Sequence, residues 1–148
     1  MLMIDQIPAP ISPGDLIEKE VDKVVLTWEQ RRWTRGHLKT VKGRDLALAL
    51  PTGSVLEPGA LLCVEPEWCV FVEAAAEPVI TISPRDHTTA LRVAFEVGNR
   101  HFPLAIEGET LLVPDDTAMV QLLDRLGVAW ERRSAAFSPV GKSHRHEH

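Results

Sequence analysis

The sequence of 148 residues contains no tyrosine and only two cysteines. The absence of tyrosine excludes a phenolate as a metal-binding or catalytic group. Cys63 and Cys69 lie six positions apart in one apolar segment and lack the C-x-x-C spacing of zinc sites and redox pairs. We therefore expect both to be small buried side chains on strands, with no disulfide between them.

Long apolar runs are also missing. No segment approaches the eighteen or so apolar residues that span a bilayer, and prolines and charges follow the first residues in place of a cleavable apolar stretch. These features predict a protein of the cytoplasm. The formal net charge is −5, so we expect neither a nucleic acid nor an anionic membrane as a partner.

The common catalytic motifs are absent. The chain has no G-x-S-x-G, no H-E-x-x-H, no phosphate-binding loop and no G-x-G-x-x-G. The adjacent carboxylates Asp115 and Asp116 are better explained as helix caps than as an acid–base pair. The sequence therefore predicts a protein that is not an enzyme.

The first half of the chain has the pattern of short strands separated by Gly/Pro turns. Residues 1–20 are rich in proline and predict an irregular leader. The strand segments that follow are residues 23–28, 33–38, 45–50, 61–64 and 68–72. Such spacing favours a small all-β barrel or sandwich over residues 1–75. The alanines of residues 73–77 predict a linker after it, although they could also continue a strand or form a helical turn.

The second half changes to a mixed α/β pattern. Ser83 is expected to cap the first helix with Pro84 at its first position, and Gly98 or Asn99 to end it in a left-handed conformation. The apolar stripe of this helix is expected at Ala90, Leu91, Ala94, Phe95 and Val97.

A strand at residues 78–82 precedes this helix. A hairpin over residues 103–113, a second helix that ends at Gly127 and a strand over residues 128–137 follow it. The order βαββαβ indicates a ferredoxin-like domain over residues 76–137 in an α+β protein of two domains, followed by a flexible tail over residues 138–148.

Histidines are concentrated at the end of the chain. His144, His146 and His148 alternate with arginine and glutamate in the last five residues. Imidazole is a good ligand for nickel, copper and zinc, and two or three of them can hold one ion. The pattern favours a metal-collecting tail, and the alternatives are a solvated charged tail without function or a purification tag.

Three histidines lie within the predicted domains. His101 follows the first helix of the second domain, where spacing alone favours a capping or partly buried residue over a ligand. His37 lies among strand residues of the first domain, and His87 lies in the first turn of a helix. For these two we favour a surface position.

Several segments resemble the UreE family, the nickel chaperones among the urease accessory proteins. Gly98-Asn99-Arg100-His101, followed by Pro103 and Leu104, is similar to that family's G-N-R-H-x-P-L signature. Residues 26–31 and 48–59 resemble its L-T-x-E-x-R and L-P-R-G-x-x-L-x-x-G patterns. The histidine-bearing C-terminus is a third similarity, and together these features span most of residues 22–148.

The resemblance implies a nickel metallochaperone that delivers Ni(II) for assembly of the urease metallocentre. It implies a homodimer through the second domain, with His101 of both subunits binding one ion and His144, His146 and His148 adding ligands. Zn(II) or Cu(II) could bind the same ligands. The implied partners are the accessory GTPase UreG and the urease apoprotein complex, which the peptide-binding first domain would help to meet.

The sequence departs from some relatives in its small number of histidines. Residues 113–117, at the start of the second helix, contain none, and the tail holds three instead of a long polyhistidine run. We therefore expect fewer ions per dimer. Two other classes stay open: a peptide- or protein-binding module with incidental metal binding, and a zinc-binding regulatory protein or small metal-dependent hydrolase.

Overall fold

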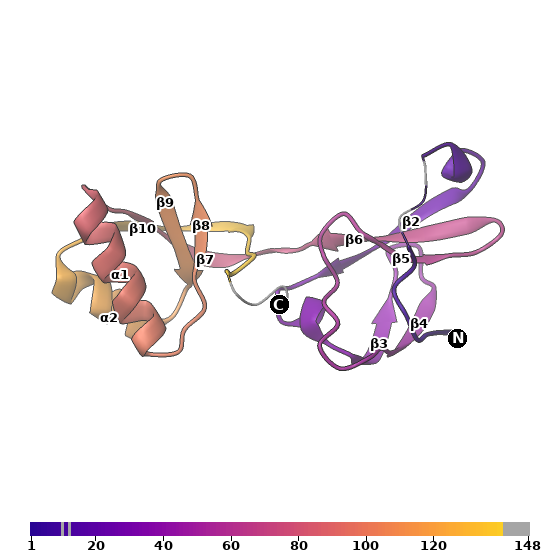
Figure 1. Ribbon diagram of the computed structural model, residues 1–148, viewed down its shortest axis with the longest axis horizontal. Helices are drawn as coiled ribbons and strands as arrows, with labels where there is room; N and C mark the ends of the chain where they lie inside the picture. The colour runs from indigo at the N-terminus through magenta and orange to yellow at the C-terminus, as the bar shows by residue number, and fades with distance from the viewer. Residues whose placement is uncertain (10, 12, 141–148) are drawn as a thin grey trace. The chain divides into compact units, whose positions relative to one another are not determined.

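The structure is a computed structural model that describes residues 1–9, 11 and 13–140 (Figure 1). The described part of the chain contains ten strands and two α-helices, so the protein is of mixed α+β class. Contacts between Cα atoms divide the chain into two compact units, the first ending at Ala75 and the second beginning at Ala76.

Two three-stranded sheets build the first unit. One sheet has the order β1-β4-β3, and the other has the order β2-β6-β5. The strands are β1 (Leu2–Ile4), β2 (Glu20–Leu26), β3 (Arg35–Lys39), β4 (Asp45–Ala49), β5 (Leu61–Val64) and β6 (Trp68–Ala74). The short 3-10 helices η1 (Pro13–Leu16) and η2 (Gln30–Arg32) lie in the connections.

Aliphatic side chains of both sheets form one buried cluster. Strand β2 contributes Val24 and Leu26, while Val21 and Val25 on its other face are exposed. This alternation follows from the period of two along a strand. The predicted strands of this half are therefore confirmed, with ends that differ by a few residues.

One expectation for the first half was wrong. The leader contains strand β1, which pairs in parallel with β4 through Leu2 and Leu46. Three residues are too few to show a period, and their partner lies more than forty positions away. Of the alternatives for residues 73–77, the structure has the continued strand, because β6 runs to Ala74 and the next strand begins at Ala76.

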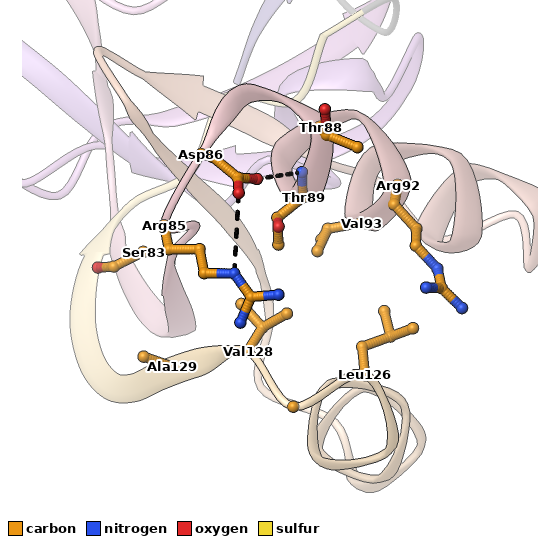
Figure 2. A pocket seen from close by; sticks show the side chains of 11 residues that line it. Ser83, Arg85, Asp86, Thr88, Thr89, Arg92, Val93, Leu126, Val128 and Ala129 are labelled. Carbon is orange, nitrogen blue, oxygen red and sulfur yellow. Dashed lines mark hydrogen bonds and ion pairs between the residues drawn. The ribbon is translucent and has the colours of Figure 1, made fainter.

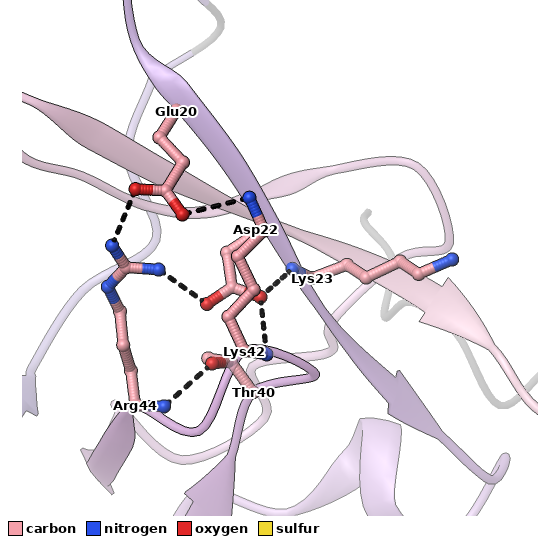
Figure 3. A network of polar contacts seen from close by, with 6 residues as sticks. All are labelled: Glu20, Asp22, Lys23, Thr40, Lys42 and Arg44. Atoms are coloured by element: carbon pink, nitrogen blue, oxygen red, sulfur yellow. Dashed lines mark hydrogen bonds and ion pairs between the residues drawn. The ribbon is translucent and has the colours of Figure 1, made fainter.

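A buried carboxylate joins the two sheets of the first unit (Figure 3). Asp22 of β2 accepts hydrogen bonds from the backbone N–H groups of Lys23 and Lys42 and from Arg44 Nη1, at 2.8, 3.1 and 2.8 Å. The guanidinium of Arg44 also lies 4.4 Å from the ring centroid of Trp68 on β6. The turn between β3 and β4 is thereby attached to the second sheet.

The second unit is a four-stranded antiparallel sheet with the order β10-β7-β9-β8. Its elements are β7 (Ala76–Ser83), α1 (His87–Asn99), β8 (Ala105–Glu107), β9 (Thr110–Pro114), α2 (Thr117–Leu126) and β10 (Ala129–Ala136). The predicted order βαββαβ is confirmed. Both helices lie on the same side of the sheet (Figure 1), and the core between them includes Ile80, Ile82 and Leu123.

Helix α2 follows the sequence prediction closely. Asp116 caps its N-terminus by accepting a hydrogen bond from the backbone N–H of Ala118 at 2.8 Å. Met119 and Leu122 on its inner face are buried. Gly127 ends the helix in the left-handed conformation, with φ of +70°.

Helix α1 differs from the prediction at its start. The N-cap is Asp86, not Ser83, and its carboxylate accepts from the backbone N–H of Thr89 at 2.8 Å (Figure 2). Ser83 is instead the last residue of β7, and Pro84 lies in the connection. Aspartate and serine are both good caps, so composition could not decide between them.

The apolar stripe of α1 also differs. Val93 and Val97 are fully buried, whereas Leu91 and Phe95 are 59% and 68% exposed. The predicted stripe therefore combined two faces of the helix, of which only one packs on the sheet. Val93 and Val97, four positions apart, meet the core, and the longer side chains of Leu91 and Phe95 face outward.

Candidate metal centre

His101 lies in the turn that ends α1. Its backbone N–H donates to the carbonyl of Gly98 at 2.9 Å, and the N–H of Phe102 donates to the carbonyl of Val97 at 3.2 Å. This pair of bonds is the Schellman motif, which requires a left-handed residue at the position of His101. The φ of His101 is +61°, and no other non-glycine residue in the described ranges has a positive φ.

The sequence had predicted the left-handed residue at Gly98 or Asn99, and this was wrong. Both belong to α1, which ends at Asn99. The side chain of Phe102 packs against the apolar core that includes Val97, and a hydrophobic contact of this kind often accompanies a Schellman motif. The position of this anchor sets the left-handed turn at the residue before it, which is His101.

Glycine is the usual residue at this position, because a Cβ in the left-handed region costs about 1–2 kcal/mol. Histidine tolerates the region better than most residues but is still strained relative to glycine. The imidazole of His101 is exposed and makes no hydrogen bond or ion pair with the rest of the described chain. Its conformation is therefore not explained by a local contact of the ring.

An apolar face of α1 leads toward this turn. Leu91 and Phe95 are exposed one turn apart, and Gly98 lies almost one further turn along the same face, given 3.6 residues per turn. A Cβ built on Gly98 would meet no atom within 4 Å. This apolar face therefore has no partner within the described part of the chain, and its side chains become smaller toward His101, from Leu91 and Phe95 to Gly98.

The last described residue, Val140, is hydrogen-bonded to a residue that follows this turn closely in the sequence. After β10, the backbone N–H of Val140 donates to the carbonyl of Leu104 at 2.8 Å. Leu104 is three residues beyond His101. The predicted ligands His144, His146 and His148 lie outside the described residues.

No other candidate metal ligand gathers with His101 in the described residues. His37 and His87 are exposed, on β3 and at the first residue of α1 respectively, as expected from their spacing. Across the ranges that the structure describes, no three residues among His, Cys, Asp and Glu gather closely enough to hold a metal ion. His101 is thus a single candidate ligand within the described part of the chain.

The cysteines are buried, as predicted. Burial raises the pKa of the Cys63 thiol to about 11, and burial also raises the pKa of Cys69. Both thiols therefore stay protonated at neutral pH, whereas a metal ligand must be a thiolate. They lie on adjacent strands β5 and β6 as free thiols.

A cavity of about 420 Å³ opens at the other end of α1 (Figure 2). Its wall includes Arg85, Asp86 and Arg92 on one side and Leu126 and Val128 on the other. No histidine or cysteine lines it, and the carboxylate of Asp86 is already engaged as the helix cap. The cavity therefore lacks the donor set of a metal site.

Sequence reasoning missed two parts of this region. The exposed Leu91 and Phe95 were assigned to the core because their spacing is helical, and spacing alone does not tell which of two apolar faces is buried. The contact of Val140 with Leu104 gave no sequence signal, since it is a single backbone hydrogen bond. The alternation of Phe137 and Pro139 with polar or exposed neighbours could have indicated an extended segment packed on a surface.

Comparison with known proteins identifies the family of both halves of the chain. Residues 4–75 match the domain family described as UreE urease accessory protein, N-terminal domain, and residues 77–148 match its C-terminal domain. No helix of the described residues is long and apolar enough to cross a membrane.

Named relatives cover most of the chain. A urease accessory protein UreE of Synechococcus sp. (strain JA-3-3Ab) is 41% identical, with 84% of this chain and 86% of the relative aligned. Proteins of the same name from Cupriavidus necator and Ralstonia nicotianae are 35% and 33% identical over the whole chain, with 80% and 72% of their own lengths covered. The chain belongs to the UreE family of urease accessory proteins.

Proposed function

We propose that this member of the family is a nickel metallochaperone, which binds Ni(II) and delivers it for assembly of the urease metallocentre. Nickel is its cargo, and the protein itself catalyses no reaction. The observation that carries the proposal is His101: an exposed imidazole held in a left-handed conformation where glycine would be less strained. A strained backbone conformation at a residue with an exposed side chain favours a functional role for that side chain, such as binding a ligand.

The proposed site is shared between two copies of the chain. His101 is one ligand, and a divalent ion needs more. The exposed Leu91 and Phe95 supply an apolar surface for a second α1, and Gly98 permits a close approach of the two helices beside His101. A two-fold axis at this end of α1 would bring both His101 imidazoles to one ion.

Tail imidazoles would complete the ligand set. His144, His146 and His148 follow Val140 within a few residues, and imidazole suits nickel as well as copper and zinc. A site of imidazoles with oxygen ligands binds reversibly, which a carrier needs. Zn(II) and Cu(II) are expected to compete for the same ligands.

The two units would have separate roles. We assign residues 1–75, a barrel or sandwich of two small sheets, to binding of protein partners. Residues 76–137, with the strand order of a ferredoxin-like sheet, would bind metal and form the homodimer, and residues 138–148 would form the tail. The partners would be UreG and the urease apoprotein complex, in the cytoplasm.

A nickel titration followed by calorimetry tests the proposal. The full chain should show one tight site per dimer, and His101→Ala should abolish it. His87→Ala is the matched control, since His87 is an exposed histidine at the opposite end of the same helix. Tight binding that survives in His101→Ala, or a full chain that ignores Ni(II), would contradict the assignment.

A further inference from the structure

Strand β3 forms one edge of its sheet. The sheet order β1-β4-β3 gives it β4 as a neighbour, and no second strand pairs with it in the described residues. In an antiparallel pair, alternate residues exchange hydrogen bonds with the neighbouring strand, while the N–H and C=O groups of the residues between them point away from it. An edge strand therefore presents half of its backbone polar groups to a further strand.

Two hydrogen bonds at the ends of β3 show which of its residues face β4. The backbone N–H of Leu50 donates to the carbonyl of Thr34 at 2.7 Å, and the N–H of Thr40 donates to the carbonyl of Arg44 at 2.8 Å. Both pairs continue the register of the β3–β4 ladder. The even-numbered residues of β3 are therefore the ones that bond to β4.

The backbone groups of Arg35, His37 and Lys39 consequently face the open edge. Within residues 1–9, 11 and 13–140, none of these groups bonds to another segment. The side chains of the same three residues are exposed on the outer face of the sheet, since they alternate with the buried Leu38. The edge therefore combines unpaired backbone groups with basic side chains.

The charge of these side chains decides which strand fits beside the edge. In a symmetric antiparallel pair of two β3 strands, Arg35 would lie opposite Lys39, and like charges in such a position are destabilising. Lys39 is already paired with Asp45 at 2.9 Å, whereas Arg35 and His37 have no ion pair within the described chain. The basic side chains thus disfavour a second copy of β3 and favour an acidic strand.

Trp33 adds an apolar surface next to this edge. Its ring lies over Gly36, where a Cβ would be 3.1 Å from Trp33 Cε3. The φ of Gly36 is +146°, a conformation that favours glycine, so this close approach depends on a residue without a side chain. Trp33 is nevertheless 40% exposed, which leaves part of the ring open to an apolar side chain of a further strand.

We propose that the edge of β3 binds an acidic, extended segment of a protein partner, which adds to the sheet as a further strand. This inference rests on the proposed function, in which residues 1–75 bind protein partners. Hydrogen bonds to the backbone of Arg35, His37 and Lys39 supply affinity. Acidic side chains at alternate positions face these three basic residues, and apolar side chains between them face Trp33, so the segment is selected by its charge and its period of two.

A peptide of alternating glutamate and valine, blocked at both ends, is the probe, and the full chain is its target. Hydrogen exchange measured by NMR should slow at the amides of Arg35, His37 and Lys39 when the peptide is added. The amides of Gly36 and Leu38 should not change, because they are already bonded to β4. A peptide with lysine in place of glutamate should not bind.

N-methylation of the peptide separates strand pairing from the attraction of charges alone. One version carries methyl groups on the glutamate amides and another carries them on the valine amides, so each blocks one edge of the extended peptide. One version should lose binding and the other should keep it, because an added strand contacts β3 through one of its edges. Binding of both versions, or of neither, would overturn the proposal.

Charge reversal gives a matched test on the protein itself. Arg35→Glu should weaken binding of the glutamate peptide about three- to tenfold, since it places like charges opposite each other. Arg85→Glu is the control, because it changes the net charge equally at a residue of the second unit whose side chain is 82% exposed. Equal weakening in both variants would contradict the proposal, because it would show a response to net charge alone.

A nickel titration of the same proteins distinguishes failure of this inference from failure of the proposed function. Arg35→Glu should bind nickel with the affinity of the natural chain. A natural chain that binds nickel but not the glutamate peptide would overturn the β3 site and leave the nickel site standing. A natural chain that binds the peptide but not nickel would instead overturn the nickel function and support the β3 site.

Discussion

Asp22 and Arg44 form an ion pair of 2.8 Å, in which the side chain of Asp22 is 1% exposed and that of Arg44 is 25% exposed. The pair joins β2 of one sheet to the β3–β4 turn of the other. Burial alone would raise the pKa of Asp22, but hydrogen bonds from the Thr40 hydroxyl, Arg44 and two backbone N–H groups outweigh it and lower the pKa below its ordinary value. The charged carboxylate is therefore part of the fold of the first unit.

Asp22→Asn should lower the free energy of unfolding by about 2–3 kcal/mol, because it leaves the Arg44 guanidinium without its charged partner and misaligns buried donors. Chemical denaturation of the two proteins measures this difference. Asp45→Asn is the control, since Asp45 pairs with Lys39 on the same hairpin with both side chains more than half exposed. Its effect should stay within about 0.5 kcal/mol, and an equal loss in both variants would contradict the argument.

The same network predicts a dependence of stability on acid. Because the pKa of Asp22 is lower in the folded chain than in the unfolded chain, its contribution is complete above about pH 4. It is lost as the pH falls through the folded-state pKa, where the carboxylate takes up a proton. Denaturation midpoints measured between pH 2 and 7 should show this decline. The decline should be shallower in Asp22→Asn, and parallel curves for the two proteins would rule out this origin.

His101→Gly should make the protein more stable and end tight nickel binding. Glycine removes the strain of the left-handed conformation, but it also gives the unfolded chain more conformational entropy. The net gain in the free energy of unfolding should be about 0.5–1 kcal/mol. Gly127→Ala is the opposite control, because Gly127 ends α2 with φ of +70°. A Cβ at this position should lower the free energy of unfolding by about 1 kcal/mol. Thermal unfolding without metal measures both, and a destabilised His101→Gly would show that the imidazole stabilises the turn.

Phe95→Glu should convert the proposed dimer into monomers. Phe95 is 68% exposed on the face of α1 that we assign to the second copy, and a carboxylate there would be desolvated in the interface. Sedimentation at micromolar concentrations distinguishes the two states. Ile17→Glu serves as the control, since Ile17 is 79% exposed in the first unit. This substitution should leave the protein a dimer. Persistence of the dimer in Phe95→Glu would move the interface elsewhere.

The sequence predicted the positions of helices and strands better than it predicted which face of each helix is buried. The second helix was predictable because its cap at Asp116, its apolar spacing and Gly127 all agree. The first helix has two apolar faces, so periodicity alone could not assign Leu91 and Phe95. The left-handed conformation of His101 depends on the packing of Phe102 after it, which is a tertiary contact. The hydrogen bond between Val140 and Leu104 joins residues that are distant in sequence, so only a three-dimensional structure could show it.

Thr81 provides the last prediction. It lies in the middle of β7, 7% exposed, and its hydroxyl has no hydrogen-bond partner in the described structure. Thr81 alternates with Ile80 and Ile82, which pack in the core with the helices, so it points to the opposite face of the sheet. A buried hydroxyl without a partner lowers stability by about 1–3 kcal/mol relative to a group that needs none.

Thr81→Val keeps the shape of the side chain and replaces the hydroxyl with a methyl group, so it should raise the free energy of unfolding by about 1 kcal/mol. Thr40→Val is the matched control in the first unit. The Thr40 hydroxyl is buried but engaged, accepting from the backbone N–H of Arg44 at 2.9 Å and donating to Asp22. The same substitution should therefore be destabilising there. Denaturant unfolding of both variants decides the matter, because a loss of stability in Thr81→Val would mean that its hydroxyl does find a partner in solution.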